Sequence, residues 1–167
     1  GMKNNEILGR KIITQKSPII GGQPGRNTDR IKTRYEYLKD DGYIRIAVPD
    51  GFSPSKEYIE AVRPNGIGPG SDDHKVLLNY KLLNTILTDI GFCVDLLEYY
   101  DENGDFIYNE WDPSQGFIRR TKRFDKRNQH GRLVYTSLLL DLINVGDKKS
   151  VILSMHAGVK IRKAKLL

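Results

Sequence analysis

The chain has 167 residues, of which 38% are hydrophobic and 29% charged, and this is the length and composition of one globular domain. No apolar run reaches the roughly 20 residues of a membrane span, and the single cysteine, Cys93, excludes an internal disulfide framework and a multi-cysteine zinc site. Without a signal-peptide pattern or paired cysteines, the expected compartment is cytoplasmic.

The net charge of +6 is distributed unevenly. Residues 1–34 hold 8 basic and 2 acidic side chains, residues 35–118 hold 6 and 16, and residues 119–167 hold 13 and 3. This pattern fits basic ends that fold back on an acidic centre, or basic segments that meet phosphate. We expect a basic N-terminal arm (1–34), an α/β domain (35–145) and a basic C-terminal extension (146–167).

The N-terminal third contains one clear predicted strand. Short β-prone pieces occur at 12–14 and 18–20, and residues 29–39 suit a short helix. Residues 43–48 (YIRIAV) are rich in β-formers, and Pro49 ends this strand because proline cannot donate to a ladder.

A long helix is predicted in the middle of the chain. Residues 52–71 are interpreted as a loop with a helical turn at 56–62, and the helix is predicted over 72–90. Ser71 suits the N-cap, two aspartates follow it at the positive end of the helix dipole, and Gly91 suits the stop. Its apolar stripe consists of Val76, Tyr80, Leu83, Leu87 and Ile90.

The C-terminal half is predicted to add strands. Residues 92–100 and 106–111 flank the Asn-Gly hairpin signal of residues 102–105. Residues 133–145 form a β-prone run with a buried middle, and residues 151–155 suit a further strand. A strand, a long helix, a strand, a hairpin and a strand are together typical of an α/β fold.

Several blocks also occur in a specific order. They are residues 35–83, LEYY (97–100), DENGDFIYNEWDP (101–113), IRRTKRFDKRN (118–128) and YTSLLLDLI (135–143). Together they resemble the C-terminal half of a family of predicted S-adenosylmethionine-dependent methyltransferases (class I, type 11-like). The resemblance implies a partial class I methyltransferase sheet, Rossmann-like, with one long helix and an antiparallel β-hairpin. Residues 92–100 and 133–143 would be the antiparallel pair that closes this sheet.

The resemblance implies S-adenosylmethionine as cofactor and leaves the methyl acceptor unknown. The family binds its cofactor in the first half, with a glycine-rich turn after a strand and an acidic residue for the ribose. Only 34 residues precede the matched block, so we expect that half to be missing and the protein to be truncated and inactive. The glycine cluster at 21–25 follows a minimal strand, and the cluster at 66–70 (GIGPG) follows none and is interpreted as a loop. No residue is therefore assigned to cofactor binding.

Three residues are the candidate catalytic residues. Asp50 follows the end of the strand 43–48, where ligands bind in open α/β sheets, and the alternative is a turn cap for Gly51. His74 follows two aspartates as a candidate proton relay, and the alternative is electrostatics at a helix N-terminus. Tyr80, within the matched block, is the third candidate on the acceptor side.

Two charged stretches have alternatives of their own. Residues 101–112 place oxygen ligands at some calcium-loop positions, but Phe106 replaces the required glycine, so we expect a hairpin turn and no metal. Residues 119–127 contain six basic side chains in nine positions. They suit nucleic acid, with Phe124 or Tyr135 for stacking, or a solvated, partly salt-bridged loop.

Two functions follow from these observations. The first is methyl transfer from S-adenosylmethionine by in-line attack, in which the protein mainly positions donor and acceptor. The second is a non-enzymatic module that binds a protein or nucleic acid through its basic segments. In the second case the open sheet edge must be covered by the N-terminal arm or a second subunit, so a homodimer is one expectation.

Overall fold

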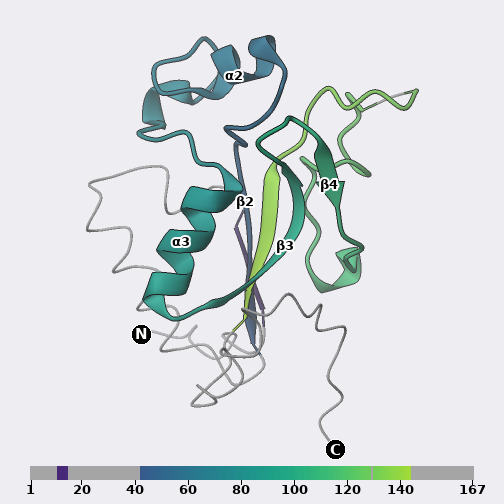
Figure 1. The fold of residues 1–167 in the computed structure, drawn as a ribbon. Helices are drawn as coiled ribbons and strands as arrows, with labels where there is room; N and C mark the ends of the chain where they lie inside the picture. Colours follow the sequence, from purple (N-terminus) through teal and green to yellow (C-terminus); the bar gives the residue numbers. More distant parts are fainter. Residues whose placement is uncertain (1–10, 15–41, 129, 144–167) are drawn as a thin grey trace, which may run out of the picture.

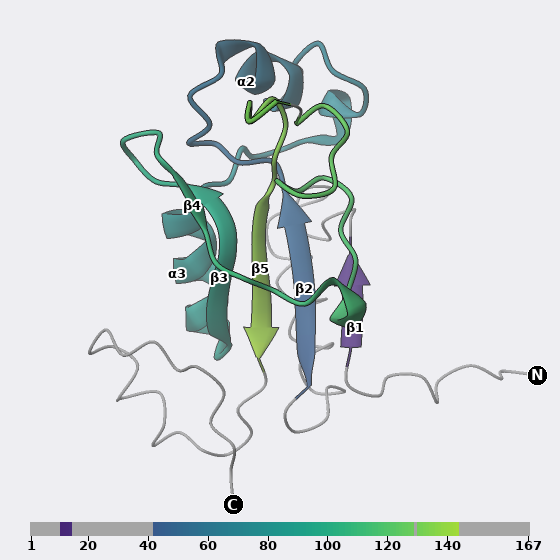
Figure 2. The ribbon, with the colours of Figure 1, turned by 90° about the vertical axis from the view of Figure 1, so that its right-hand side faces the viewer.

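The computed structural model describes residues 11–14, 42–128 and 130–143. Its strands are β1 (Lys11–Thr14), β2 (Tyr43–Val48), β3 (Cys93–Tyr100), β4 (Phe106–Tyr108) and β5 (Leu138–Ile143). They form one sheet (Figure 1), in the order β1-β2-β5-β3-β4 that Figure 2 shows. β1 is parallel to β2, β5 lies antiparallel between β2 and β3, and β4 is antiparallel to β3. The described part is thus a mixed α/β fold that contains the predicted hairpin and the predicted antiparallel pair.

The two faces of the sheet follow from the period of two along its central strands. Ile44, Ile46 and Val48 of β2 share one core with alternate leucines of β5, and α3 (Tyr80–Ile90) covers this face (Figure 2). Ala47 and Leu139 point to the opposite face, where they pack with side chains of the segment 109–137. Each fully buried leucine contributes about 1.5–3 kcal/mol of transfer free energy.

α3 is shorter than predicted: it begins at Tyr80 and not at residue 72. The Leu78 carbonyl accepts a hydrogen bond from the Gly51 N–H at 2.7 Å, and this long-range contact holds the chain before α3 in extended form. Asn79, and not Ser71, is the N-cap, and its side chain accepts from the Leu82 N–H at 3.0 Å. Residues 71–73 form a 3-10 turn instead.

The predicted stop and turn signals are confirmed. Gly91 ends α3 in the left-handed region, with φ of 108°, and its N–H donates to the carbonyls of Leu87 and Thr88. Gly104 turns the β3–β4 hairpin with φ of 82°. The predicted turn at 56–62 is the helix α2 (Lys56–Val62), which Ser55 caps by accepting from the Tyr58 N–H.

β5 begins later than the predicted run of 133–145. The N–H groups of Val134 and Tyr135 donate to the side chain of Asn128, at 2.9 and 2.8 Å, and not to a strand ladder. A polar side chain from a preceding loop therefore decides where the ladder starts. From Leu138 to Leu142 every residue of β5 is buried.

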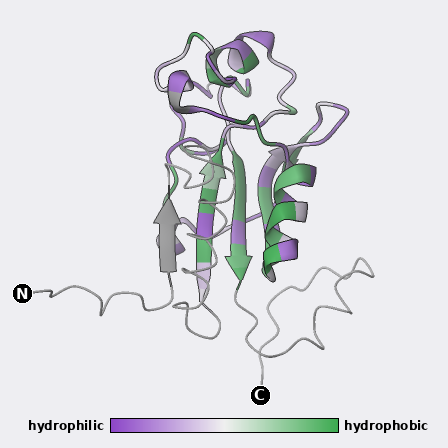
Figure 3. Ribbon diagram, turned by 90° about the vertical axis from the view of Figure 1, so that its left-hand side faces the viewer, coloured by the Kyte–Doolittle hydropathy of each residue, from purple (hydrophilic) through white to green (hydrophobic). Residues whose placement is uncertain are grey.

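A buried ion pair interrupts the apolar middle of the sheet. Arg45 of β2 faces Asp141 of β5 across the ladder, and its Nε and Nη2 donate to the two carboxylate oxygens, at 2.8 and 2.7 Å. Figure 3 shows the strands as largely hydrophobic, with hydrophilic residues inside them. The Arg45 Nη1 group donates to the carbonyls of Asp112 and Gly116. The ion pair therefore also holds the segment 109–137, which covers this face of the sheet.

A β-bulge in β3 changes which face its second half presents. Leu96 is opposite Leu140, whereas Glu98 is opposite Leu139, so Leu97 is the extra residue. Without it, Glu98 would share the aliphatic face with Leu96. With it, Glu98 is buried on the other face.

Several predicted elements lie outside the described residues. These are the pieces at 18–20 and 29–39, the strand at 151–155 and the C-terminal extension at 146–167. Within the predicted arm, residues 11–14 contribute β1, which covers the edge of β2. Among the described helices, none has the length and apolarity needed to span a membrane.

Candidate functional site

The carboxyl end of β2 leads into a turn that Asp50 holds together. Asp50 Oδ1 accepts from the Phe52 N–H at 3.0 Å, and Oδ2 accepts from the Tyr100 N–H at 2.7 Å. The side chain is fully buried, and this burial raises the pKa of Asp50 to about 6, although both N–H donors favour the charged form. The carboxylate thus caps the turn after β2 and links it to the end of β3.

Tyr58 of α2 continues these contacts. Its hydroxyl accepts from the Asp50 N–H at 3.0 Å, and burial raises the pKa of Tyr58, so the hydroxyl stays protonated. The Tyr58 ring meets Tyr135 edge to face at 4.9 Å, and the Arg127 guanidinium lies 3.6 Å from the centre of the Tyr135 ring. Arg127, the last of residues 119–127, therefore lies at the same end of the sheet as Asp50.

Tyr80 lies at the rim of this end. Its ring packs against Tyr99 at 4.8 Å and against Phe52 at 6.0 Å. Its hydroxyl donates to Glu102 at 2.7 Å, and this bond raises the pKa of Tyr80 to about 12. The Lys81 ammonium, 2.6 Å from the same carboxylate, and the Tyr80 hydroxyl hold the pKa of Glu102 at about 2. At neutral pH this rim therefore presents a phenol beside an ionised carboxylate.

His74 is bound elsewhere. Its Nδ1 lies 2.6 Å from the carbonyl of Val62, at the end of α2. A carbonyl only accepts, so Nδ1 carries the proton and Nε2 is the remaining acceptor. Among the described residues, no hydrogen bond joins two of the three candidates. The hydrogen bond from the Gly51 N–H to the Leu78 carbonyl brings together the chain next to Asp50 and the chain next to Tyr80. The His74 side chain is bound instead to the end of α2.

The glycine cluster at 66–70 is engaged in packing on α2. The Ile67 and Gly68 N–H groups donate to the carbonyls of Glu60 and Ala61. A Cβ at Gly68 would lie 2.3 Å from the Ala61 oxygen, so only glycine allows this approach. The N–H groups that would hold a cofactor phosphate or carboxylate are already used here. The cluster at 66–70 is therefore a loop, as predicted, and its residues do not fit a cofactor turn. The cluster at 21–25 lies outside the described residues.

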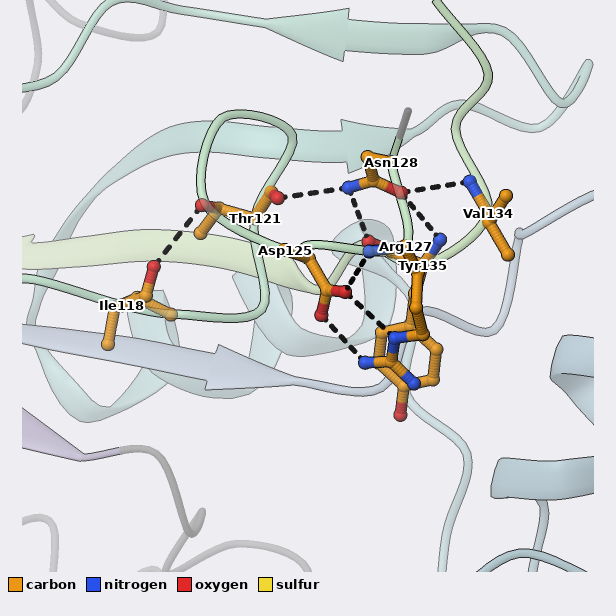
Figure 4. Close-up of polar contacts among 7 residues, drawn as sticks. All are labelled: Ile118, Thr121, Asp125, Arg127, Asn128, Val134 and Tyr135. Atoms are coloured by element: carbon orange, nitrogen blue, oxygen red, sulfur yellow. Dashed lines mark hydrogen bonds and ion pairs between the residues drawn. The ribbon is translucent and has the colours of Figure 1, made fainter. Parts of the chain in front are cut away.

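Asn128 joins the residues 119–127 to the chain that precedes β5 (Figure 4). Its amide nitrogen donates to the carbonyls of Thr121 and Tyr135 at 3.0 and 2.7 Å. Its amide oxygen accepts from the N–H groups of Val134 and Tyr135. All four hydrogen-bonding positions of one side chain are therefore used.

Glu98 holds the middle of the same segment. Its carboxylate is fully buried and accepts from the Trp111 indole N–H at 2.9 Å and from the Lys122 backbone N–H at 2.7 Å. Burial raises the pKa of Glu98, and both donors oppose this shift. Sequence reasoning missed Glu98, Arg45 and Asp141. A lone charge inside an apolar strand was the available signal for each of them.

The hairpin turn at 101–105 uses its carboxylate on the backbone. Asp101 Oδ1 accepts from the N–H groups of Asn103 and Asp105, both at 2.9 Å. These contacts are those of a hairpin turn, as the sequence predicted for residues 102–105. In the described part of the chain, no three His, Cys, Asp or Glu side chains are grouped to hold a metal ion.

Comparison with known proteins finds no matching family model and no matching curated protein. Among solved structures, the chain is similar to the crystal structure of a SAM dependent methyltransferase from Archaeoglobus fulgidus, with a TM-score of 0.39 and 17% identity. The match covers 80% of this chain and 57% of that one, so the chain spans little more than half of that protein's length. A likeness of this degree assigns neither a family nor an activity to the chain.

Proposed function

We propose that this protein is related to the S-adenosylmethionine-dependent methyltransferases and that its described residues form the acceptor side of such a site. The observation that carries the proposal is the position of Asp50. It lies at the carboxyl end of β2, the end of an open α/β sheet where ligands bind. The ordered blocks of sequence that resemble the methyltransferases include this strand and the turn after it.

Each candidate residue then has a proposed role. Asp50 is a positioning residue, because both carboxylate oxygens hold backbone N–H groups. Tyr80 and Glu102 are the groups that would orient an acceptor. Both lie at the rim, where the Tyr80 hydroxyl donates a hydrogen bond to the Glu102 carboxylate. His74 would act through Nε2, the ring nitrogen that its bond to Val62 leaves available.

When bound, S-adenosylmethionine would supply an electrophilic methyl group to a positioned nucleophile. In the glycine cluster at 66–70 the N–H groups of Gly66, Ile67 and Gly68 already bind carbonyls of the chain, so they are not offered to this cofactor. We assign no step of methyl transfer to the described residues. Tyr80 and Glu102 instead orient the acceptor, and their pKa values of about 12 and about 2 keep the rim in one protonation state at neutral pH.

Thermal unfolding with S-adenosylmethionine and S-adenosylhomocysteine tests this proposal. Ligand at about 100 times its dissociation constant adds about 2.7 kcal/mol, which raises the melting temperature of a chain of this size by roughly 5–10 °C. We expect this rise with both ligands and not with adenosine. A melting curve unchanged by millimolar amounts of either ligand would contradict cofactor binding by this chain.

A non-enzymatic interaction module is the second candidate function. The observation that favours it is the exposure of Arg119, Arg120, Lys122 and Arg123, which form no ion pair among the described residues.

A further inference from the structure

The residues 119–127, called the basic segment below, retain an excess of positive charge in the folded protein. Its exposed cations are Arg119, Arg120, Lys122, Arg123, Lys126 and Arg127. The Arg127 guanidinium pairs with Asp125 at 2.6 Å, and Asp125 itself belongs to the segment. Among the described residues, no ion pair joins Arg119, Arg120, Lys122 or Arg123 to the acidic centre of the chain. The charge of these four cations is therefore not neutralised by ion pairs in this part.

Two of these cations are held over aromatic rings. The Lys122 ammonium lies 4.6 Å from the centre of the Tyr108 ring, and the Arg123 guanidinium lies 5.1 Å from that of Phe124. A ring face limits where the cation moves without neutralising its charge. Both side chains are therefore directed while remaining available to an anion.

The backbone beneath the cations is fixed by buried side chains. Glu98 accepts the Lys122 N–H, Thr121 is fully buried, and Asn128 holds the Thr121 carbonyl. Ile118, directly before the segment, is buried in the core on this face of the sheet. The cations thus project from a built surface and lose less conformational entropy on binding than those of a free chain.

An exposed aromatic ring lies beside this surface. Phe117 keeps 48% of its surface exposed, although its ring meets Phe124 edge to face at 4.9 Å. An edge-to-face contact covers at most one face of the Phe117 ring, so ring surface remains for a flat partner. Proteins that bind single-stranded nucleic acid combine cations that follow the backbone with rings that stack on bases. An acidic protein surface would use the cations and leave the ring unexplained.

We propose that the basic segment and Phe117 form a binding surface for single-stranded nucleic acid. Phosphates lie against Arg119, Arg120, Lys122 and Arg123, and a base stacks on Phe117. This function goes beyond methyl transfer and does not depend on cofactor binding, so the two proposals fail or succeed separately.

Fluorescence anisotropy of a labelled oligothymidylate of about 12 nucleotides tests this surface. We expect binding at about 50 mM salt that weakens as salt rises, because released counterions drive it. The variant R119A/R120A should bind at least about tenfold more weakly and lower the slope of log affinity against log salt by about 1.4, since each single-strand phosphate contact contributes about 0.7. F117A should weaken binding about fivefold or more at unchanged slope, because stacking releases no ions.

A charge-matched control separates this site from net charge. T85E/T88E also lowers the net charge by two, but both threonines are exposed on α3, which covers the opposite face of the sheet. We expect it to bind within about twofold of the unchanged protein. All four side chains altered in the charge variants are exposed, so each protein should retain its melting temperature.

Three results would overturn the proposal. The first is no binding at about 50 mM salt. The second is an equal loss of affinity in T85E/T88E and R119A/R120A, which would indicate attraction by net charge. The third is an unchanged affinity in F117A together with equal competition by polyglutamate, which would indicate a surface for acidic proteins.

Discussion

The Asp50 carboxylate accepts the Tyr100 N–H at 2.7 Å and so links the ends of two strands that are not neighbours in the sheet. β5 lies between β2 and β3, so the Asp50 side chain reaches across the start of β5 to bind the end of β3. The same carboxylate holds the Phe52 N–H. The residue that the sequence proposes for chemistry therefore also has a structural role, and a substitution there must be read for both.

For Asp50, stability should depend on pH between about 4 and 6. The folded pKa of about 6 exceeds the ordinary value of 3.8, so the folded state favours the protonated form. The contribution of Asp50 to stability is therefore greatest below pH 4, falls as pH rises to 6 and is constant above. The fall is on the order of 3 kcal/mol. Urea unfolding across this range should show wild-type protein losing stability relative to Asp50→Asn as pH rises.

Asp50→Asn should also carry a loss that does not depend on pH. The amide group accepts through one oxygen only, so either Phe52 or Tyr100 loses its partner, at a cost of about 1–3 kcal/mol. Asp89→Asn, which changes an exposed carboxylate of α3, is the control. Parallel curves for wild type and Asp50→Asn from pH 4 to 7 would contradict a raised pKa.

Removing Arg45 should be more damaging than removing the whole ion pair. Arg45→Met leaves the buried Asp141 without its partner and releases the carbonyls of Asp112 and Gly116. Breaking a buried pair costs about 3–5 kcal/mol. The double variant R45M/D141L should recover part of this loss, because no uncompensated charge remains. Denaturant unfolding of both variants checks this, and a double variant less stable than Arg45→Met would refute it.

Asn128 should control the local stability of the chain that enters β5. Asn128→Ala removes the acceptor of the Val134 and Tyr135 N–H groups, and their hydrogen exchange should accelerate about 10- to 100-fold. Asn128→Asp keeps an acceptor oxygen and loses only the donation to Thr121 and Tyr135 carbonyls, so it should protect these two amides better than alanine does. Equal exchange in both variants would show that the side chain does not hold this segment.

The bond between Tyr80 and Glu102 should be visible in the titration of the phenol. With the ionised carboxylate as acceptor, the pKa of Tyr80 is about 12. Glu102→Gln removes the charge, so this pKa should move down toward 10. Nuclear magnetic resonance of tyrosine carbons labelled next to the hydroxyl measures it, and Tyr80→Phe identifies the signal. An unchanged Tyr80 pKa in Glu102→Gln would contradict the bond.

The sequence predicted the strands better than the start of the helix. The strand 43–48 and the turn of the hairpin were predicted correctly because apolar alternation and an Asn-Gly turn are local signals. The second hairpin strand is shorter than the predicted 106–111, because β4 ends at Tyr108. Ser71 and the aspartates after it formed an equally plausible local signal, yet the helix begins at Tyr80. A hydrogen bond from Gly51 to Leu78, from 27 positions earlier in the chain, overrode it.

The candidate site was predicted in part. Asp50 was placed correctly at the end of β2, because proline and aspartate after an apolar run mark a strand end. The sequence did not show that Tyr100 and Tyr58 would occupy its polar groups, since these partners come from other elements. The support of the basic segment by Glu98 and Asn128 was likewise invisible, because each acts across long stretches of chain.

The sequence by itself determined which strands exist and which of their side chains are apolar, since a period of two is written in consecutive residues. The face on which Glu98 lies was decided only by the tertiary structure. Its alternation with Leu96 predicts a place among aliphatic side chains, but the bulge at Leu97 turns it to the opposite face. There the Trp111 and Lys122 N–H groups satisfy it. A buried carboxylate needs such donors, and only the folded chain brings them together.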